Sequence, residues 1–446
     1  MTIALPPLLN IPDDPALLGL ATAAQPEAML EACRRYLTSV SDEDRGAWTR
    51  CLPGEAVYQP GRSCRIAYTL ESGDAERPEM IYARWAPDER DHASATWVDA
   101  PEGGFELYRY PRDRRMREIR SMTREDWLRE ASQAWFAEWL GDGVLDDDGW
   151  RCTPIKYVPE SRLVCRLKGR WVNGQGERWV RAYVRITRRD DVREQFELMR
   201  RIERQFDDAA CPLSVPHPLG AVPERRLLAT EFIRGRTMLD LVKDGEIDIV
   251  ERVSRALPAV GMLAIPRNDE SRNITAVTPT AMLADLGAIS AELRGLCTPL
   301  REWSTRKVAP PDRAQVVHGD LHARQIILKG DRLCLVDWDR CAGGDPTQDI
   351  TNLAAELDAL DPVQVHSGPV DGCTLAAACV DAWRRNGGSF NAAAARWWAT
   401  RAYVLRAWGL LRHSRPGWPG NVRRLLERAA AVDREQESWL PQDAVR

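Results

Sequence analysis

The stretch from residue 316 to 340 constrains the fold of this chain more than any other part of the sequence. Its two short apolar runs are separated by Lys-Gly-Asp-Arg, whose glycine and aspartate favour a tight hairpin turn. One polar cluster precedes the first run, and another follows the second. A hairpin therefore brings three polar side chains to one end of a small ribbon: Asp320, Gln325 and Asp337.

An oxygen-rich cluster of this kind is suited to two chemical tasks. It can hold a hard divalent cation, which prefers oxygen ligands, and it can accept a proton from a hydroxyl nucleophile. The alternative is a buried polar hairpin whose carboxylates only cap the next helix. The combination of His-Gly-Asp, a five-residue step, a hairpin and a second aspartate favours the chemical interpretation.

This pattern resembles the motif of the kinase-like phosphotransferases, the superfamily of aminoglycoside phosphotransferases, choline kinases and bacterial maltokinases. Their motif reads His-Gly-Asp, four residues, Asn, a hairpin, and an Asp that binds magnesium. The resemblance implies that Asp320 is the catalytic base and that Asp337 binds magnesium. Gln325 occupies the Asn position, as in maltokinase-like members, and its carbonyl can still ligate the metal through one extra methylene.

Two further aspartates near this motif stay ambiguous at the level of sequence. Asp349 follows Gly344-Asp345-Pro346, which matches the next segment of the family motif. It is as readily structural as functional, because the start of a helix favours a negative charge. Asp339 could lie near the metal or face solvent.

The resemblance extends upstream to a small lobe, where Arg185 stands at the level of the family's phosphate-binding lysine. A planar guanidinium does not replace a compact ammonium at a site shaped for one of them, and an exposed basic residue on a strand is an equal alternative. Glu194 and Glu197 on the next helix are the expected partners of Arg185. The turn before this strand holds Val-Pro-Glu-Ser-Arg rather than a glycine-rich loop, and its Arg162 is a weak candidate for phosphate contact.

Residues 227–235 resemble the connection between the two lobes of the family. There, backbone groups of an extended segment bind the adenine edge. The resemblance assigns that segment to Glu231, Phe232 and Ile233. A simple buried edge strand would have nearly the same sequence. Farther on, the resemblance makes Trp397, Trp398 and Trp408 candidates for the acceptor pocket, although tryptophan in a helical stripe is more often packing.

The N-terminal half carries a duplicated hairpin. Tyr58-Gln-Pro60 matches Tyr157-Val-Pro159 at an offset of 99 residues, and Tyr82-Ala-Arg84 matches Tyr183-Val-Arg185 at an offset of 101. Each copy reads as strand, turn and strand. The expected fold is therefore α+β: a protein-kinase-like bilobal fold with a small antiparallel lobe and a helical large lobe, preceded by an extra module. The expected domains are 1–145, 146–235 and 236–446, with the first boundary in the turn-rich stretch 141–149.

Composition narrows the class of function. The net charge is −4 with both signs interspersed, which argues against nucleic acid as a partner. No apolar run reaches the roughly 20 residues of a membrane helix, so we expect a cytoplasmic protein without a membrane partner. The 11 cysteines are scattered and histidines number 6, which indicates neither a disulfide framework nor a zinc site. The sequence does not indicate the oligomeric state.

The leading hypothesis is a small-molecule kinase that uses ATP and Mg. In it, Asp320 deprotonates a hydroxyl of the acceptor, Asp337 and Gln325 hold magnesium, and Arg185 clamps phosphate. The maltokinase-like motif favours a sugar or polyol acceptor. The alternative is a nucleotide-binding pseudokinase with a regulatory or scaffolding role. It is supported by the departures at positions 185 and 325 and by the missing glycine-rich loop.

Overall fold

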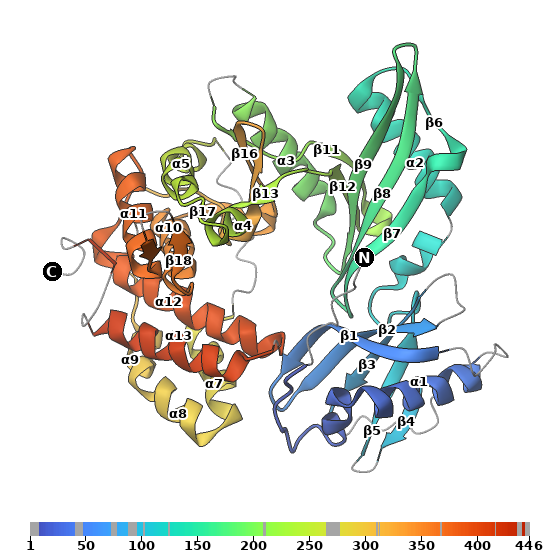
Figure 1. Ribbon diagram of the computed structural model, residues 1–446, viewed down its shortest axis with the longest axis horizontal. Coiled ribbons are helices and arrows are strands. Elements are labelled where there is room, and N and C mark those ends of the chain that lie inside the picture. Colours follow the sequence, from blue (N-terminus) through green and yellow to red (C-terminus); the bar gives the residue numbers. More distant parts are fainter. Residues whose placement is uncertain are drawn as a thin grey trace.

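The computed structural model describes residues 9–40, 48–72, 78–87, 96–100, 103–123, 125–207, 211–264, 277–308, 311, 313–365, 368–414, 416–434 and 439–441. The described chain forms three parts arranged around a common centre: an N-terminal module, a small lobe and a helical large lobe (Figure 1). In these ranges, no helix combines the length and the apolar character that crossing a membrane requires.

The N-terminal module is a five-stranded antiparallel sheet with one helix on it. Its strands are β1 (Trp48–Gln59), β2 (Ser63–Ser72), β3 (Glu79–Trp85), β4 (Trp97–Ala100) and β5 (Gly103–Arg109), in the order β1-β2-β3-β5-β4. Helix α1 (Pro26–Val40) packs on this sheet through Met29, Cys33 and Tyr36, whose three- and four-residue spacing forms one buried face.

The small lobe repeats this plan with additions. Its sheet consists of β6 (Val144–Leu145), β7 (Arg151–Val158), β8 (Arg162–Asn173), β9 (Gly176–Thr187), β11 (Pro218–Val222) and β12 (Leu227–Glu231). The order is β11-β12-β9-β8, with β6 and β7 both paired to β8. Helix α2 (Glu125–Leu140) packs on this sheet, and helix α3 (Val192–Phe206) lies between β9 and β11 in the chain.

The large lobe is mainly helical. Its helices are α4 (Met238–Lys243), α5 (Asp248–Ala256), α6 (Pro258–Gly261), α7 (Pro279–Ile289), α8 (Ala291–Cys297), α9 (Arg301–Thr305), α10 (Thr347–Asp358), α11 (Gly372–Arg385), α12 (Ala392–Arg412) and α13 (Trp418–Asp433). The expected hairpin is β15 (Ile326–Lys329) and β16 (Arg332–Leu335), in a sheet of order β10-β16-β15-β13 with β10 (Leu213–Ser214) and β13 (Arg236–Thr237). Two short pairs, β14 (Gln315–Val317) with β17 (Ala342–Gly344) and β18 (Val363–Val365) with β19 (Gly368–Val370), complete it.

This architecture confirms the predicted α+β fold with an antiparallel small lobe, a helical large lobe and an additional N-terminal module. The repeat is larger than the predicted hairpin. The strand order β1-β2-β3-β5-β4 corresponds to β7-β8-β9-β12-β11, and each sheet is preceded by a helix, α1 or α2. The link between β3 and β4 is shorter than α3 itself, so the first copy has no room for a helix of that length. The module is thus a reduced second copy of the small lobe.

An equivalent aspartate anchors each copy, and these two aspartates are again 99 residues apart in the sequence. Asp14 accepts hydrogen bonds from the Tyr58 hydroxyl at 2.8 Å and the Gly61 amide at 2.7 Å. Asp113 accepts them from the Tyr157 hydroxyl at 2.6 Å and the Glu160 amide at 2.9 Å. Each aspartate thereby ties the segment before its helix to the turn between the first two strands of its sheet.

From the packing of α2 we propose a first domain boundary earlier than the expected residue 145. Helix α2 buries Leu128 and Phe136 in one cluster with Leu145, Trp171 and other residues of the small-lobe sheet. It therefore packs as part of the small lobe. A boundary near residue 110, between the two copies of the repeat, fits the packing better than one in the 141–149 stretch.

Candidate functional site

The His-Gly-Asp turn is fixed by a buried carboxylate on α10. Asp349 accepts hydrogen bonds from the amides of His318 at 2.6 Å and Gly319 at 3.0 Å. Burial raises the pKa of Asp349, and the two amides and the charge of His318 oppose this only in part. Gly319 has φ +80°, and a Cβ there would lie 2.2 Å from the Arg340 carbonyl oxygen, so this turn needs glycine. Asp349 is structural in this arrangement.

Two more side chains on the same face of α10 hold the rest of the loop. Asn352 donates to the Leu321 carbonyl at 2.6 Å, and Glu356 accepts from the Ala323 amide at 2.5 Å. Burial opposes the charge of Glu356, but Arg406, 3.4 Å away, together with His322, the Ala323 amide and Arg324 outweighs it, and the pKa of Glu356 is lowered. Residues three and four apart share one helix face, which is why 349, 352 and 356 reach the same loop.

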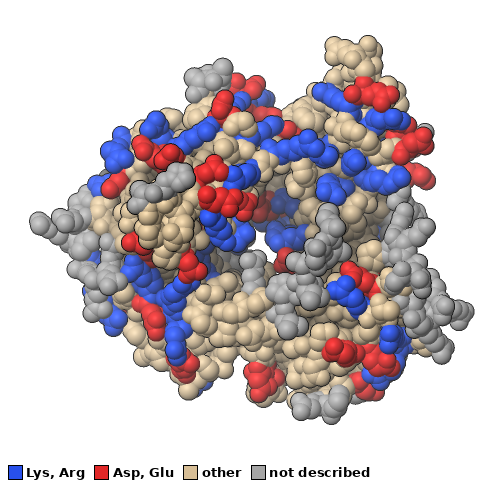
Figure 2. Space-filling view, viewed as in Figure 1, with Lys and Arg blue, Asp and Glu red and all other residues tan. Residues whose placement is uncertain are grey.

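This support leaves Asp320 facing a cavity. The cavity has a volume of about 860 Å³ and lies between the module, the small lobe and the large lobe. Figure 2 shows the central hollow with Lys and Arg side chains gathered around it. The Asp320 side chain is 31% exposed, and the guanidinium of Arg340 lies 3.5 Å from its carboxylate. Asp320 is thus accessible to a hydroxyl group in the cavity.

Gln325 and Asp337 line the same cavity and present unsatisfied oxygens. The Gln325 side chain is buried, and its carbonyl oxygen has no hydrogen-bond partner among the described residues. Asp337 has φ +66°. Burial opposes ionisation of Asp337, but Arg185 and Arg162 outweigh it and its pKa is lowered. A carboxylate and an orphaned amide oxygen fit a magnesium ion that also takes oxygens from a nucleotide. The described residues form no cluster of three or more His, Cys, Asp or Glu for a metal.

Arg185 projects from β9 on the face opposite to the buried Ala182, Val184 and Ile186. It does not pair with Glu194 or Glu197, which are exposed on the far side of α3. Its partners are Asp339, at 2.6 and 2.7 Å, the side-chain carbonyl of Gln195 at 2.8 Å, and Asp337 at 3.4 Å. The carboxylates of Asp339 and Asp337 outweigh the effect of burial and raise the pKa of Arg185.

The prediction that Glu194 or Glu197 pairs with Arg185 was wrong. It rested on spacing along α3 and did not take into account which face of the helix is apolar. Val192, Leu198, Met199 and Ile202 form the buried stripe of this helix, and Gln195 is the polar residue within it. A polar residue in such a stripe faces the sheet and needs a partner there. Asp339, whose location stayed open, lines the cavity beside Asp337, and its carboxylate holds the Arg185 fork.

The remaining predicted site residues occupy two places. Arg162 lines the cavity, and its charge lowers the pKa of Asp337. Glu231, Phe232 and Ile233 connect the lobes and do not line this cavity. The Phe232 amide donates to Arg181 at 3.3 Å, whereas the Ile233 backbone has no hydrogen bond with another described residue. The Glu231 carboxylate pairs with Lys329 of the hairpin at 2.5 Å.

The three tryptophans proposed for the acceptor pocket are not part of the cavity lining. Trp398 donates to Asp345 at 3.2 Å, and Trp408 donates to Asp285 at 2.9 Å. Trp397 packs between Trp398 and Trp303. They contribute packing within the large lobe.

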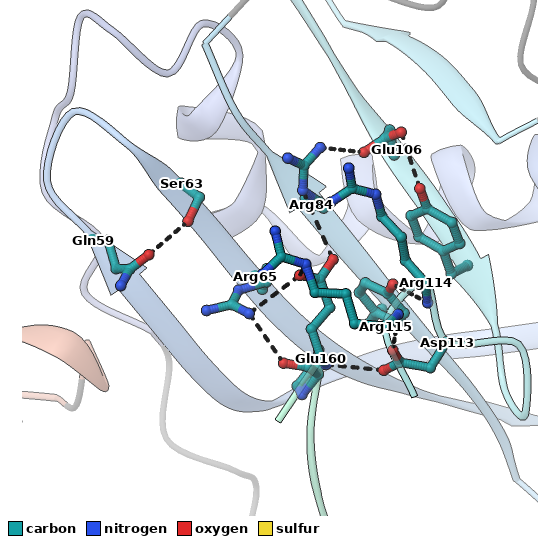
Figure 3. A network of polar contacts seen from close by, with 12 residues as sticks. Gln59, Ser63, Arg65, Arg84, Glu106, Asp113, Arg114, Arg115 and Glu160 are labelled. Carbon is teal, nitrogen blue, oxygen red and sulfur yellow. Dashed lines mark hydrogen bonds and ion pairs between the residues drawn. The ribbon is translucent and has the colours of Figure 1, made fainter. Parts of the chain in front are cut away.

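A network of ion pairs in the wall of the cavity links the module to the small lobe (Figure 3). Glu160, in the turn between β7 and β8, lies 3.3 Å from Arg65, 3.8 Å from Arg84 and 3.3 Å from Arg115. Arg84 also pairs with Glu106 at 2.6 Å. Sequence reasoning did not single out Glu160, although it noted its turn and matched Arg84 to Arg185.

Comparisons with known proteins give a family match and a set of similar solved structures. A family model described as "Phosphotransferase enzyme family" matches residues 169–398, more than half of the chain. No curated protein matches. Similar solved structures include macrolide 2'-phosphotransferase MphH from Brachybacterium faecium (17% identity, TM-score 0.38, 69% of this chain and 99% of that one). Others are a thermostable mutant of aminoglycoside phosphotransferase APH(4)-Ia (16%, 0.41, 68% and 98%) and a choline/ethanolamine kinase family protein from Mesorhizobium loti (16%, 0.37, 70% and 94%).

Proposed function

The chain belongs to the phosphotransferase enzyme family and is thus a small-molecule kinase that draws on ATP, and on this premise we propose the roles of its residues. The proposal is that Asp320 acts as the base toward an acceptor hydroxyl and that Asp337 and Gln325 hold magnesium. The observation that carries it is the shared cavity: Asp320, Asp337 and the orphaned Gln325 carbonyl all line it.

The reaction balances with these groups. The acceptor oxygen forms a bond to the terminal phosphorus of ATP, the bond from that phosphorus to the bridging oxygen breaks, and ADP leaves with the electron pair. The hydroxyl proton passes to the Asp320 carboxylate, which is accessible from the cavity. Arg162 and Arg185 supply positive charge beside the phosphates. Magnesium, when bound, would neutralise phosphate charge. Most of the catalytic gain is expected from alignment and charge stabilisation, because phosphoryl transfer asks little covalent work of the protein.

A sugar or polyol is the proposed class of acceptor. Its hydroxyls would match a lining in which polar and charged side chains predominate, and no tryptophan platform faces the cavity. The adenine segment is proposed at Glu231, Phe232 and Ile233. The Ile233 backbone, which makes no hydrogen bond to a described residue, is suited to an adenine edge.

The test pairs ATP consumption over a panel of sugars, amino alcohols and aminoglycosides with calorimetry of Mg·ATP binding. For Asp320→Ala we expect unchanged nucleotide affinity and transfer slower by roughly a hundredfold or more. Arg255→Met, an exposed change on α5, serves as the control with wild-type turnover. Wild-type transfer by Asp320→Ala would remove Asp320 from the role of base.

One observation favours a second candidate, a nucleotide-binding pseudokinase with a regulatory or scaffolding role. The Arg185 fork is occupied by Asp339 through two contacts, so this charge is already partly neutralised. Magnesium-dependent stabilisation by ATP, with no turnover on any acceptor of the panel, would support the pseudokinase. Acceptor-dependent release of ADP would exclude it.

A further inference from the structure

The N-terminal module forms part of the cavity that contains Asp320. The turn between β1 and β2, together with the facing side of β2 and β3, contributes Arg62, Arg65 and Arg84 to its lining. The module is joined to both lobes there. Arg62 pairs with Asp285 of α7 at 2.8 Å, and the His413 ring nitrogen lies 3.0 Å from the Ala56 carbonyl. A ligand in the cavity therefore contacts the module as well as the kinase lobes.

The lining of this cavity is strongly basic. Arginines number nine and carboxylates four, so positive charges exceed negative ones by five when the two histidines are neutral. Besides the three arginines of the module, the lining includes Arg115, Arg162, Arg188, Arg189, Arg340 and Arg412. A cavity with walls of one sign concentrates ligands of the opposite sign.

Several of these charges are neutralised from outside the lining. Arg62 pairs with Asp285, Arg84 with Glu106, and Arg189 with Asp191. Arg412 differs, because it forms no ion pair or hydrogen bond with any described residue. Its guanidinium lies 4.4 Å from the centre of the Trp408 ring, and its buried Nε has no partner. Partial burial of an unpaired cation is costly, and an anionic ligand would offset that cost.

Arg412 belongs to a group of like charges beside the proposed base. Burial lowers the pKa of Arg412, and the charges of Arg65, Arg62 and Arg340 lower it further, whereas the charge of Asp285 raises it. Arg340 is also the residue whose guanidinium lies 3.5 Å from Asp320. The arginine cluster of Arg62, Arg65, Arg340 and Arg412 thus adjoins the carboxylate that would receive the hydroxyl proton.

The nucleotide accounts for only part of this excess. Mg·ATP carries a net charge of about −2 once the ion's own charge is included. Its phosphates would lie at Asp337, Gln325 and Arg162, which line the cavity together. The arginine cluster is contributed by other elements, the β1–β2 turn, strand β2, η8 (Trp338–Arg340) and the end of α12.

Resting on the proposed function, we propose that the acceptor is an anionic sugar or polyol. Its phosphate or carboxylate group binds Arg412, Arg340 and the module's Arg62 and Arg65, while one of its hydroxyls faces Asp320. The reduced second copy of the small lobe is accordingly half of an acceptor site. Arginine is suited to this task, because its planar fork matches the oxygens of phosphate and carboxylate groups.

The test measures acceptor binding apart from catalysis. Four sugars are titrated by calorimetry onto the protein saturated with Mg·ADP: glucose 6-phosphate, gluconate, glucose and glucosamine. We expect at least one of the two anionic sugars to bind and both the neutral and the cationic sugar to bind at least tenfold more weakly. The better of the two anionic sugars distinguishes a phosphate ligand from a carboxylate ligand.

Variants assign the effect to the arginine cluster. Arg412→Met keeps a chain over Trp408 without the charge and should weaken anionic binding about tenfold or more. Arg62→Gln, at an exposed side chain with little risk to folding, should weaken it severalfold. Arg255→Met on α5 removes an equally exposed arginine far from the cavity and should change nothing.

Glucose or glucosamine binding as tightly as both anionic sugars would overturn the inference. So would the absence of binding by both anions, or unchanged anion affinity in Arg412→Met and Arg62→Gln. Anion binding that depends on Arg412, without release of ADP from ATP, would support the anion site and contradict the proposed transfer reaction. The two proposals therefore fail in different measurements.

Discussion

Glu160 adopts a backbone conformation that glycine adopts more easily. Its φ is +57°, and its counterpart in the N-terminal copy is Gly61, with φ +66°. The same turn thus uses glycine where nothing is asked of the side chain. In the second copy, the carboxylate lies among Arg65, Arg84 and Arg115 (Figure 3). These ion pairs offset the backbone strain and hold the turn that approaches the cavity.

Substitutions of Glu160 separate the effect of its ion pairs from the effect of its backbone strain. Glu160→Ala loses the ion pairs and keeps the strain, so we expect the free energy of unfolding to fall by about 3 kcal/mol, as for a buried pair that loses one partner. For Glu160→Gly the free energy of unfolding should fall by about 1 kcal/mol less, because glycine relieves the strain of the left-handed conformation. Denaturant unfolding measures both, with Gly61→Ala as the control for strain alone. Equal losses in Glu160→Ala and Glu160→Gly would contradict a strained turn.

A substitution of Gln325 tests the proposed metal site by removing a single ligand atom. Gln325→Leu keeps the volume and removes the carbonyl oxygen that has no partner among the described residues. We expect the magnesium concentration for half-maximal ATP turnover to rise about tenfold or more. Gln325→Asn, which restores an amide one methylene shorter, should retain more of the wild-type magnesium affinity. A magnesium dependence unaltered by leucine would exclude Gln325 as a ligand.

The residues of the motif could be named from sequence because they lie within one hairpin and its flanks. Asp320, Gln325 and Asp337 all line the cavity. The partner of Arg185 could not be named, because Asp339 is contributed by the other lobe. Contacts over such separations depend on how lobes dock, which local spacing does not encode. Arg412 was missed for the same reason.

At the scale of the element, α10 supports the loop that carries Asp320. Its side chains at 349, 352 and 356 bond four backbone groups of residues 318–323. Only the aspartate was visible in the sequence, through its place in the family motif. The others belong to the same helix face, and their loop partners became apparent only with the loop in position.

Glu356 gives this support a dependence on pH. The folded pKa of Glu356 lies below its ordinary value of 4.5, so the unfolded state binds the proton more tightly. The contribution of Glu356 to stability is therefore complete above pH 4.5 and is lost as pH falls through the lowered pKa. We expect Glu356→Gln to be less stable than wild type by about 1–3 kcal/mol at pH 7, with the difference shrinking below pH 4.5. Thermal unfolding across pH measures this. A difference that grows on acidification would contradict the assignment.

The repeat shows what sequence can predict about whole elements. The matching tyrosine and arginine anchors predicted two hairpins, and both are present as β1–β3 and β7–β9. That the remaining two strands of each sheet also belong to the repeat escaped notice, because α3 precedes them in one copy and the link in the other copy is shorter than α3. The insertion breaks the constant offset on which detection of a repeat depends.

At the scale of the whole molecule, three parts meet at one cavity. The predicted fold classes of the parts were right, but how the module docks against the two lobes could not be predicted from the sequence. Its contacts, such as Arg62 with Asp285 and His413 with Ala56, join residues far apart in the chain. This docking turns a small-lobe repeat into a wall of the proposed acceptor site.

The central claim is that Asp320 receives the hydroxyl proton during phosphoryl transfer from ATP. The most direct test is a single-turnover measurement by phosphorus NMR, with the acceptor that the panel identifies, comparing wild type with Asp320→Asn. We predict a new phosphomonoester signal from the wild type, and formation at least roughly a hundredfold slower with Asp320→Asn at equal occupancy by Mg·ATP. Phosphomonoester formation by Asp320→Asn at the wild-type rate would contradict the account.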